Sequence, residues 1–112
     1  MIFNKTRKSI LSKKYVLCSS FFLKSLGMMF RIRPKALIFA FEKEKNVPLH
    51  MLFVFFPIDV IYLDKNKKVV EIKKALKPFT FYKPQKKSKY VVELPAGAIQ
   101  KSGTSLGDKI KF

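Results

Sequence analysis

The feature that most limits the fold of this chain is a long apolar run from Val47 to Leu63, with Pro57 and Asp59 inside it. Such a run can form a membrane helix, a buried helix or buried strands. A membrane helix needs about 20 mostly apolar residues, and a carboxylate such as that of Asp59 is costly near the centre of a bilayer. Pro57 opposes a soluble helix, because it removes a backbone donor and clashes with the preceding turn, at roughly 3 kcal/mol.

The residue types in this run favour strands, since Phe, Val, Ile and Tyr suit a pleated backbone. We therefore predict two strands, over about 50–56 and 58–63, with a bend or bulge at Pro57. Apolar side chains at consecutive positions indicate that both faces of these strands are covered.

Shorter patterns predict the other elements. Residues 1–12 show no persistent period, so we expect a loose basic N-terminal arm over residues 1–14 and a single small β domain over 15–112. A polar turn is predicted over Glu42–Asn46. A hairpin turn is predicted over Asp64–Lys68, which Asp64 starts through its side chain and in which Asn66 takes positive φ. Further strands are predicted over 13–18, 36–41, 69–73, 78–83, 90–94 and 109–112, and short helices over 21–28 and 95–103. Strands this dense favour a mainly β sandwich or barrel.

The charge is strongly one-sided, at +17 from 24 basic and 7 acidic residues. Such a surface attracts polyanions, namely nucleic acid, anionic lipid or acidic proteins. The arginines are only Arg7, Arg31 and Arg33. Since the arginine fork is what reads guanine, we expect phosphate-dominated, salt-sensitive contact rather than sequence-specific readout. The alternative is that the lysines reflect an AT-rich genome or a hot habitat.

Ten lysines and one glutamate lie between Lys65 and Lys89, which makes this segment the best candidate for binding. If the hairpin turn and the later loop share an edge, their lysines form one positive patch, with Tyr82 and Phe79 as a stacking face beside it. The alternative is a solvated surface without a partner. The polyanion-binding candidates are Lys65, Lys67, Lys68, Lys86, Lys87 and Lys89.

Few residues suggest catalysis. Cys18 is the only cysteine, which excludes an intrachain disulfide and a cysteine metal site, and fits a reducing compartment. His50 is the only histidine, so we predict no metal and no cofactor. Asp59 needs a partner if it is buried, either backbone amides at the bend after Pro57 or Arg31. The alternative is an acid or base in a ligand pocket formed by Asp59, His50 and Arg31.

The N-terminal region superficially resembles a secretory signal, with basic residues before a short apolar piece over 15–23. Two serines interrupt that piece, and Lys24 follows it. We favour a strand that leads into a helix, and we expect a cytoplasmic protein without a transmembrane segment.

Four stretches, taken in order, resemble the family called domain of unknown function 192, or uncharacterised protein family 0127. They are Leu26–Arg31, Leu37–Phe41, Phe56–Asp64 followed by Val69–Ile72, and Tyr90–Gly97 followed by Gly107–Ile110. The resemblance covers roughly residues 16–112 and implies a compact, jelly-roll-like β-sandwich or barrel with no established activity. His50–Val54 stands where bacterial members carry Trp-Met-Lys-Asn-Thr, a form that is similar to archaeal members.

Three functions remain open at this point. The first is a binding module whose lysines contact nucleic-acid phosphates without sequence preference. The second is an enzyme or small-ligand pocket around Asp59, His50 and Arg31, although we lean against an enzyme. The third is a subunit that docks an acidic protein partner by its basic face.

Overall fold

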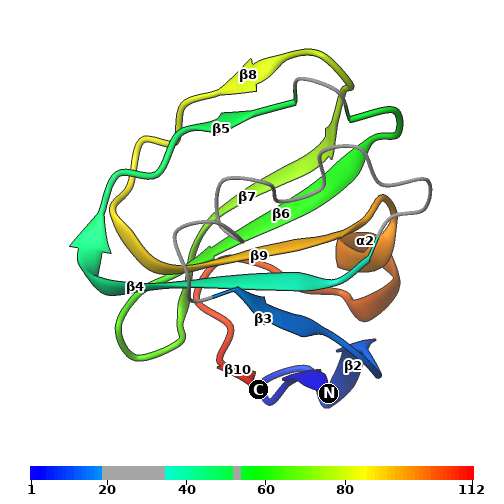
Figure 1. Cartoon of the computed structure of the whole chain (residues 1–112). Coiled ribbons are helices and arrows are strands. Elements are labelled where there is room, and N and C mark those ends of the chain that lie inside the picture. Colours follow the sequence, from blue (N-terminus) through cyan, green and yellow to red (C-terminus); the bar gives the residue numbers. More distant parts are fainter. Residues whose placement is uncertain (19–34, 52–53) are drawn as a thin grey trace.

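A twisted five-stranded sheet forms the centre of the molecule, in the order β3-β4-β9-β6-β7 (Figure 1). The computed structural model describes residues 1–18, 35–51 and 54–112. Within these residues β3 pairs with β4 in parallel, and the other neighbours in the sheet are antiparallel. The strands are β3 Val16–Cys18, β4 Leu37–Lys45, β6 Ile58–Leu63, β7 Val69–Leu76 and β9 Ser88–Pro95.

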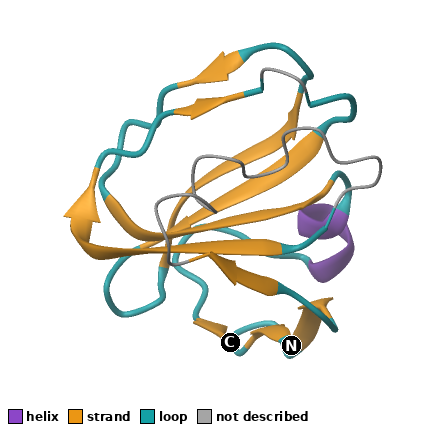
Figure 2. Ribbon diagram, in the orientation of Figure 1, coloured by secondary structure: helices purple, strands orange, loops and turns teal. Residues whose placement is uncertain are grey.

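Smaller elements cover the two faces of this sheet (Figure 2). A two-stranded ribbon of β5 (Leu49–His50) and β8 (Phe81–Tyr82) lies on one side. A three-stranded sheet and the helix α2 (Ala98–Ser102) lie on the other. The three strands are β1 Ile2–Asn4, β2 Ser9–Ser12 and β10 Ile110–Lys111. The described strands form a mainly β, sandwich-like fold whose central sheet does not close into a barrel.

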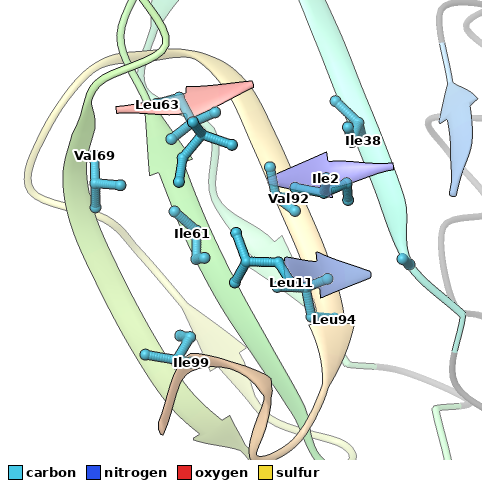
Figure 3. Close-up of a cluster of buried hydrophobic side chains, with 11 residues drawn as sticks. Ile2, Leu11, Ile38, Ile61, Leu63, Val69, Val92, Leu94 and Ile99 are labelled. Carbon is cyan, nitrogen blue, oxygen red and sulfur yellow. The ribbon is translucent and has the colours of Figure 1, made fainter. Parts of the chain in front are cut away.

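Strand β6 separates two hydrophobic cores, which explains its apolar side chains on both faces. Ile61 and Leu63 belong to the first core, together with Ile2, Leu11 and Ile99 (Figure 3). On the opposite face, Val60 and Tyr62 belong to the second core, which the β5–β8 ribbon covers. All six residues of β6 are buried, so the strand over 58–63 and its two covered faces are confirmed.

The strand expected over 50–56 is wrong, because the ribbon strand β5 ends at His50. The N–H of Met51 donates to the carbonyl of Thr80 at 2.7 Å, and the carbonyl of Met51 accepts the N–H of Phe79 at 2.7 Å. The chain then leaves the ribbon, which allows Met51 and Val54 to enter the second core. Residues 52–53 lie outside the described part.

The loose conformation expected for residues 1–12 is also wrong, since β1 and β2 pair with each other and β1 pairs with β10. Asp108 fixes the turn between β1 and β2 by accepting hydrogen bonds from Asn4 and from Arg7, each at 3.0 Å. Burial alone would raise the pKa of Asp108, but the bonds from Asn4, Ser105 and Arg7 hold it below its usual value. Because β10 lies at the other end of the chain from β1, no local sequence pattern reveals the pairing of these two strands.

The hairpin of β6 and β7 is confirmed, and Asp64 starts its turn by accepting the N–H groups of Asn66 and Lys68 at 2.9 and 3.0 Å. Positive φ falls on Lys67, at 61°, rather than on Asn66. The turn predicted over Glu42–Asn46 is wrong, because β4 continues to Lys45.

Near the C-terminus, the strand predicted over 78–83 shortens to Phe81–Tyr82, since Phe79 takes a φ of 59° that breaks the extended backbone. The helix predicted over 95–103 is present as α2, and Gly103 ends it with a φ of 69°. The helix predicted over 21–28 lies outside the described residues.

Candidate functional site

Three segments that carry lysines converge at one end of the central sheet: the end of β4, the β6–β7 turn and the β8–β9 loop (Figure 1). A carboxylate oxygen of Glu44 accepts the N–H of Lys65 at 2.9 Å, which joins the turn to β4. Lys45 is paired with Ser88, and the side-chain amide of Asn46 donates to the carbonyl of Pro84 at 2.7 Å, which joins the loop to β4. The two loops therefore share an edge, as the patch hypothesis required.

We call this region the Lys-rich end. It includes two lysines that the sequence analysis did not place there. Lys45 arrives through the pairing of β4 with β9, and Lys109 lies opposite Lys68 in an isolated bridge. The members of the Lys-rich end are Lys45, Lys65, Lys67, Lys68, Lys86, Lys87, Lys89 and Lys109.

The carboxylates at the Lys-rich end are bonded to backbone N–H groups instead of to ammonium groups. Glu44 and Asp64 accept N–H groups of the β6–β7 turn. Glu71 accepts the N–H groups of Gln85 and Lys86, each at 2.9 Å. Within the described ranges the one ion pair is Arg7–Asp108, so no described lysine has a carboxylate oxygen within 4.0 Å of its ammonium nitrogen.

Three of these lysines lie over aromatic rings, and one of them is Lys45, whose ammonium nitrogen is 4.6 Å from the ring centroid of Phe41. The ammonium nitrogen of Lys67 lies 3.9 Å from the ring centroid of Phe112, and those of Lys67 and Lys89 each lie 5.8 Å from that of Tyr90. Contacts of this kind contribute about 0.5–1 kcal/mol at exposed sites. They bring the β6–β7 turn and the start of β9 together around one ring.

The aromatic pair predicted to stack beside the patch is arranged differently. The hydroxyl of Tyr82 donates to Glu71, and its ring centroid lies 6.1 Å from that of Tyr62 in the second core. Burial, followed by the hydrogen bond to Glu71 and the charge of Glu71, raises the pKa of Tyr82 to about 12. Phe79 is half exposed and lies edge-to-face with Phe55, with ring centroids 5.6 Å apart. Tyr82 therefore packs against the second core and is only partly exposed, with the ammonium nitrogen of Lys73 5.7 Å from its ring centroid.

Asp59 joins β6 to β7 and to α2. One of its carboxylate oxygens accepts the N–H of Ala75 at 2.9 Å, and the other accepts the N–H groups of Gly97 and Ile99, each at 3.0 Å. Backbone amides are thus its partners, but the expectation that they come from the bend after Pro57 is wrong, because they come from β7 and from the start of α2. Both carboxylate oxygens of Asp59 are therefore bonded to backbone N–H groups of neighbouring elements.

The described residues do not bring the predicted pocket together. Asp59 bonds to α2 on the side of the first core, whereas His50 is exposed on the ribbon that covers the second core. Arg31 lies outside the described residues. In the described part of the chain no group of three His, Cys, Asp or Glu side chains can hold a metal ion.

The second core contains a carboxylate that the sequence analysis missed. Glu93 on β9 is only 6% exposed, and burial raises its pKa to about 7. No hydrogen bond or ion pair joins its carboxylate to another described residue. Nearby, the hydroxyl of Tyr62 is fully buried and has no hydrogen-bond partner among the described residues. Burial, more than the charges of Tyr82, Glu71 and Glu93, raises the pKa of Tyr62. Residues two apart on a strand point to the same face, so the apolar Val91 on the same strand indicated that the side chain of Glu93 is buried.

A hollow of about 420 Å³ lies among Met1, Phe3, Lys111 and Phe112, next to the three-stranded sheet. Its lining offers no carboxylate, imidazole or thiol side chain. Among the described residues that line it, Lys111 supplies the one ionisable side chain.

Fold and site together define a small β-sandwich-like domain with an unneutralised basic end. Comparison with known proteins then gives the family. The chain belongs to the family of uncharacterised proteins known as domain of unknown function 192, whose model matches residues 3–112. The archaeal resemblance noted in the sequence is confirmed by curated relatives, all of them uncharacterised proteins of the UPF0127 group.

Two relatives illustrate the extent of the match. A protein of Pyrococcus furiosus is 40% identical over 95 residues, which cover 83% of this chain and 81% of the relative. A protein of Pyrococcus horikoshii is 34% identical over 114 residues, which cover 100% of this chain and 98% of the relative.

Two solved bacterial structures share the fold. A protein of unknown function from Novosphingobium aromaticivorans superposes with a TM-score of 0.81 at 20% identity, over 88% of this chain and 74% of that one. A protein from Sinorhizobium meliloti described as a putative transcription regulator also gives 0.81, at 22% identity, over 87% of this chain and 79% of that one. Among the described residues of our chain, no helix is long and apolar enough to cross a membrane.

Proposed function

We propose that this protein is a binding module whose Lys-rich end contacts the phosphates of nucleic acid without sequence preference, in the cytoplasm. One observation carries the proposal: lysines from three separate segments converge, and none of their ammonium groups is ion-paired. An exposed ammonium without a carboxylate neighbour keeps its full charge for an external anion.

The chemistry of the side chains points to phosphate contact in particular. Lysine is a flexible point charge, which suits phosphate oxygens, whereas base recognition uses the planar fork of arginine. Each phosphate that is neutralised releases condensed counterions, so binding must weaken steeply with salt. The Sinorhizobium protein's description as a putative transcription regulator agrees with such a role, but its 22% identity shows the fold alone.

Charge reversal at the Lys-rich end tests this function. The triple variant Lys65→Glu, Lys68→Glu and Lys87→Glu replaces three exposed lysines of that end. Fluorescence anisotropy with labelled oligonucleotides, at salt concentrations from about 50 to about 200 mM, gives the affinity and its salt slope. We expect the variant to bind at least about 100-fold more weakly at about 50 mM salt, and its salt slope to fall.

A matched control changes the same charge elsewhere. Lys13→Glu, Lys14→Glu and Lys101→Glu also replace exposed lysines, outside the three segments of the Lys-rich end. An equal loss of affinity in the two triple variants would mean that only net charge matters. Undetectable binding by the wild-type protein at about 50 mM salt would refute the proposed function, because phosphate contacts are strong there.

A further inference from the structure

The outer face of the β5–β8 ribbon presents two rings side by side. Phe81 and His50 are directly opposite each other in the antiparallel pairing, and both are exposed, Phe81 to 73%. Residues opposite each other in a strand pair share a face, with Cβ atoms about 4.5–5.5 Å apart. The neighbouring pair, Leu49 and Tyr82, packs against the second core and so occupies the inner face. We call the exposed pair of Phe81 and His50 the stacking platform.

The chain leads directly from the stacking platform to the Lys-rich end (Figure 1). Exposed lysines at 83, 86 and 87 follow Phe81 along the β8–β9 loop. Glu71 fixes this loop by accepting the N–H groups of Gln85 and Lys86, and Asn46 fixes it through Pro84. The backbone that carries these lysines is therefore held in a fixed relation to the ribbon and to β4.

We propose that the stacking platform binds an unpaired base, so that the nucleic acid recognised by this protein is single-stranded; this rests on the proposed function of the Lys-rich end. A strand whose phosphates lie along the lysines of the β8–β9 loop can place a base on the ring of Phe81. Every base has a flat face, so such stacking tolerates any sequence. In a duplex the flat faces of the bases are stacked on one another and cannot be reached by a ring, so the duplex gains nothing from Phe81.

The arrangement of charge favours a linear polyanion over a lipid surface. Exposed rings beside lysines also occur on proteins that enter the headgroup region of anionic membranes. Here the β8–β9 loop leads from the platform to the end of β4, which in turn contacts the β6–β7 turn, so the segments of the Lys-rich end follow one another away from the platform (Figure 1). A bilayer would have to reach the platform and the distant lysines in one plane, whereas a flexible strand can follow the loop.

The test measures the affinity of the 112-residue protein for an oligothymidine strand and for a mixed-sequence duplex of the same length. Phe81→Ala removes the ring from the platform, and Phe81→Trp restores a larger one. Phe55→Ala is the matched control, because Phe55 is also largely exposed, at 62%, but lies outside the ribbon. We expect Phe81→Ala to weaken binding of the single strand about tenfold. Duplex binding and the unfolding temperature should stay unchanged, Phe81→Trp should restore affinity, and Phe55→Ala should have no effect.

The possible failures are distinguishable. If the wild-type protein binds neither nucleic acid, the proposed function itself fails. If it binds both equally and Phe81→Ala changes neither affinity, contact with polyanions stands and the single-strand inference is overturned. Phosphatidylglycerol vesicles supply the remaining comparison. If Phe81→Ala weakens their binding but leaves the single strand unaffected, the platform is a lipid-binding surface and the inference is likewise overturned.

Discussion

The buried carboxyl of Glu93 predicts a specific dependence of folding stability on pH. Glu93 lies on β9, within the central sheet, and its side chain is almost inaccessible to water. Burial raises its pKa from 4.5 to about 7, because a charged carboxylate is poorly accommodated in an apolar core. The variant Glu93→Gln keeps the size and polarity of the side chain but removes the titration.

The magnitude follows from the two pKa values. Below pH 4.5 the carboxyl is protonated in both the folded and the unfolded protein, so it contributes no pH dependence. As the pH rises, the unfolded chain releases the proton first, and the folded state loses stability until Glu93 itself ionises near pH 7. The interval from 4.5 to about 7, at about 1.4 kcal/mol per pH unit, corresponds to a loss of about 3 kcal/mol.

Urea denaturation across this pH range measures the effect. The free energy of unfolding of wild-type protein minus that of Glu93→Gln should fall by about 3 kcal/mol between pH 4.5 and a pH just above 7. The other titrating groups are common to both proteins, so they cancel in this difference. Glu42→Gln, which changes an exposed carboxylate in the same way, is the matched control for the substitution itself. Parallel profiles for wild type and Glu93→Gln would refute the reasoning, because they would show that the Glu93 carboxylate is solvated or paired in the folded protein.

Two further substitutions test buried polar groups. Asp59→Ala leaves the three N–H groups that Asp59 accepts without their partner, so we expect urea denaturation to show a loss of at least about 3 kcal/mol. Asp64→Ala, at a partly exposed turn, should lower the free energy of unfolding by only about 1 kcal/mol. Equal losses in the two variants would contradict the role of Asp59 in joining β6 to β7 and α2. Tyr62→Phe removes a buried hydroxyl that has no hydrogen-bond partner in the described part of the chain, so stability should stay within about 1 kcal/mol of wild type or rise. A loss well above that would indicate an additional bond to Tyr62.

The central strands could be predicted because their signals are local. The residues over 58–63 are apolar on both faces, which directly reflects the two cores that β6 separates. Asp64 and the lysines around it also mark their hairpin turn within a few residues of sequence. Elements such as these depend on the properties of neighbouring residues, and these properties can be recognised in a single sequence.

Elements that depend on distant partners could not be predicted in the same way. Strand β1 is held by β10, at the opposite end of the chain, and a run of three residues carries too short a pattern to reveal it. Lys45 and Lys109 join the Lys-rich end only through the pairing of β4 with β9 and the bridge to Lys68. The stacking platform likewise exists only because His50 and Phe81 become opposite each other in the ribbon.

The placement of the acidic residues argues against composition as the sole origin of the basic surface. Lysine enriched for stability at high temperature is organised with acidic side chains into surface ion-pair networks. In this chain every acidic residue lies in the described part, and the one ion pair there is Arg7–Asp108. Apart from Glu42, the acidic side chains are either buried or bonded to N–H groups of the fold. They are Glu44, Asp59, Asp64, Glu71, Glu93 and Asp108. Apart from Glu42 and Glu93, the acidic side chains thus hold turns and strands together, and none of them is ion-paired with a described lysine, which is the observation on which the proposed function rests.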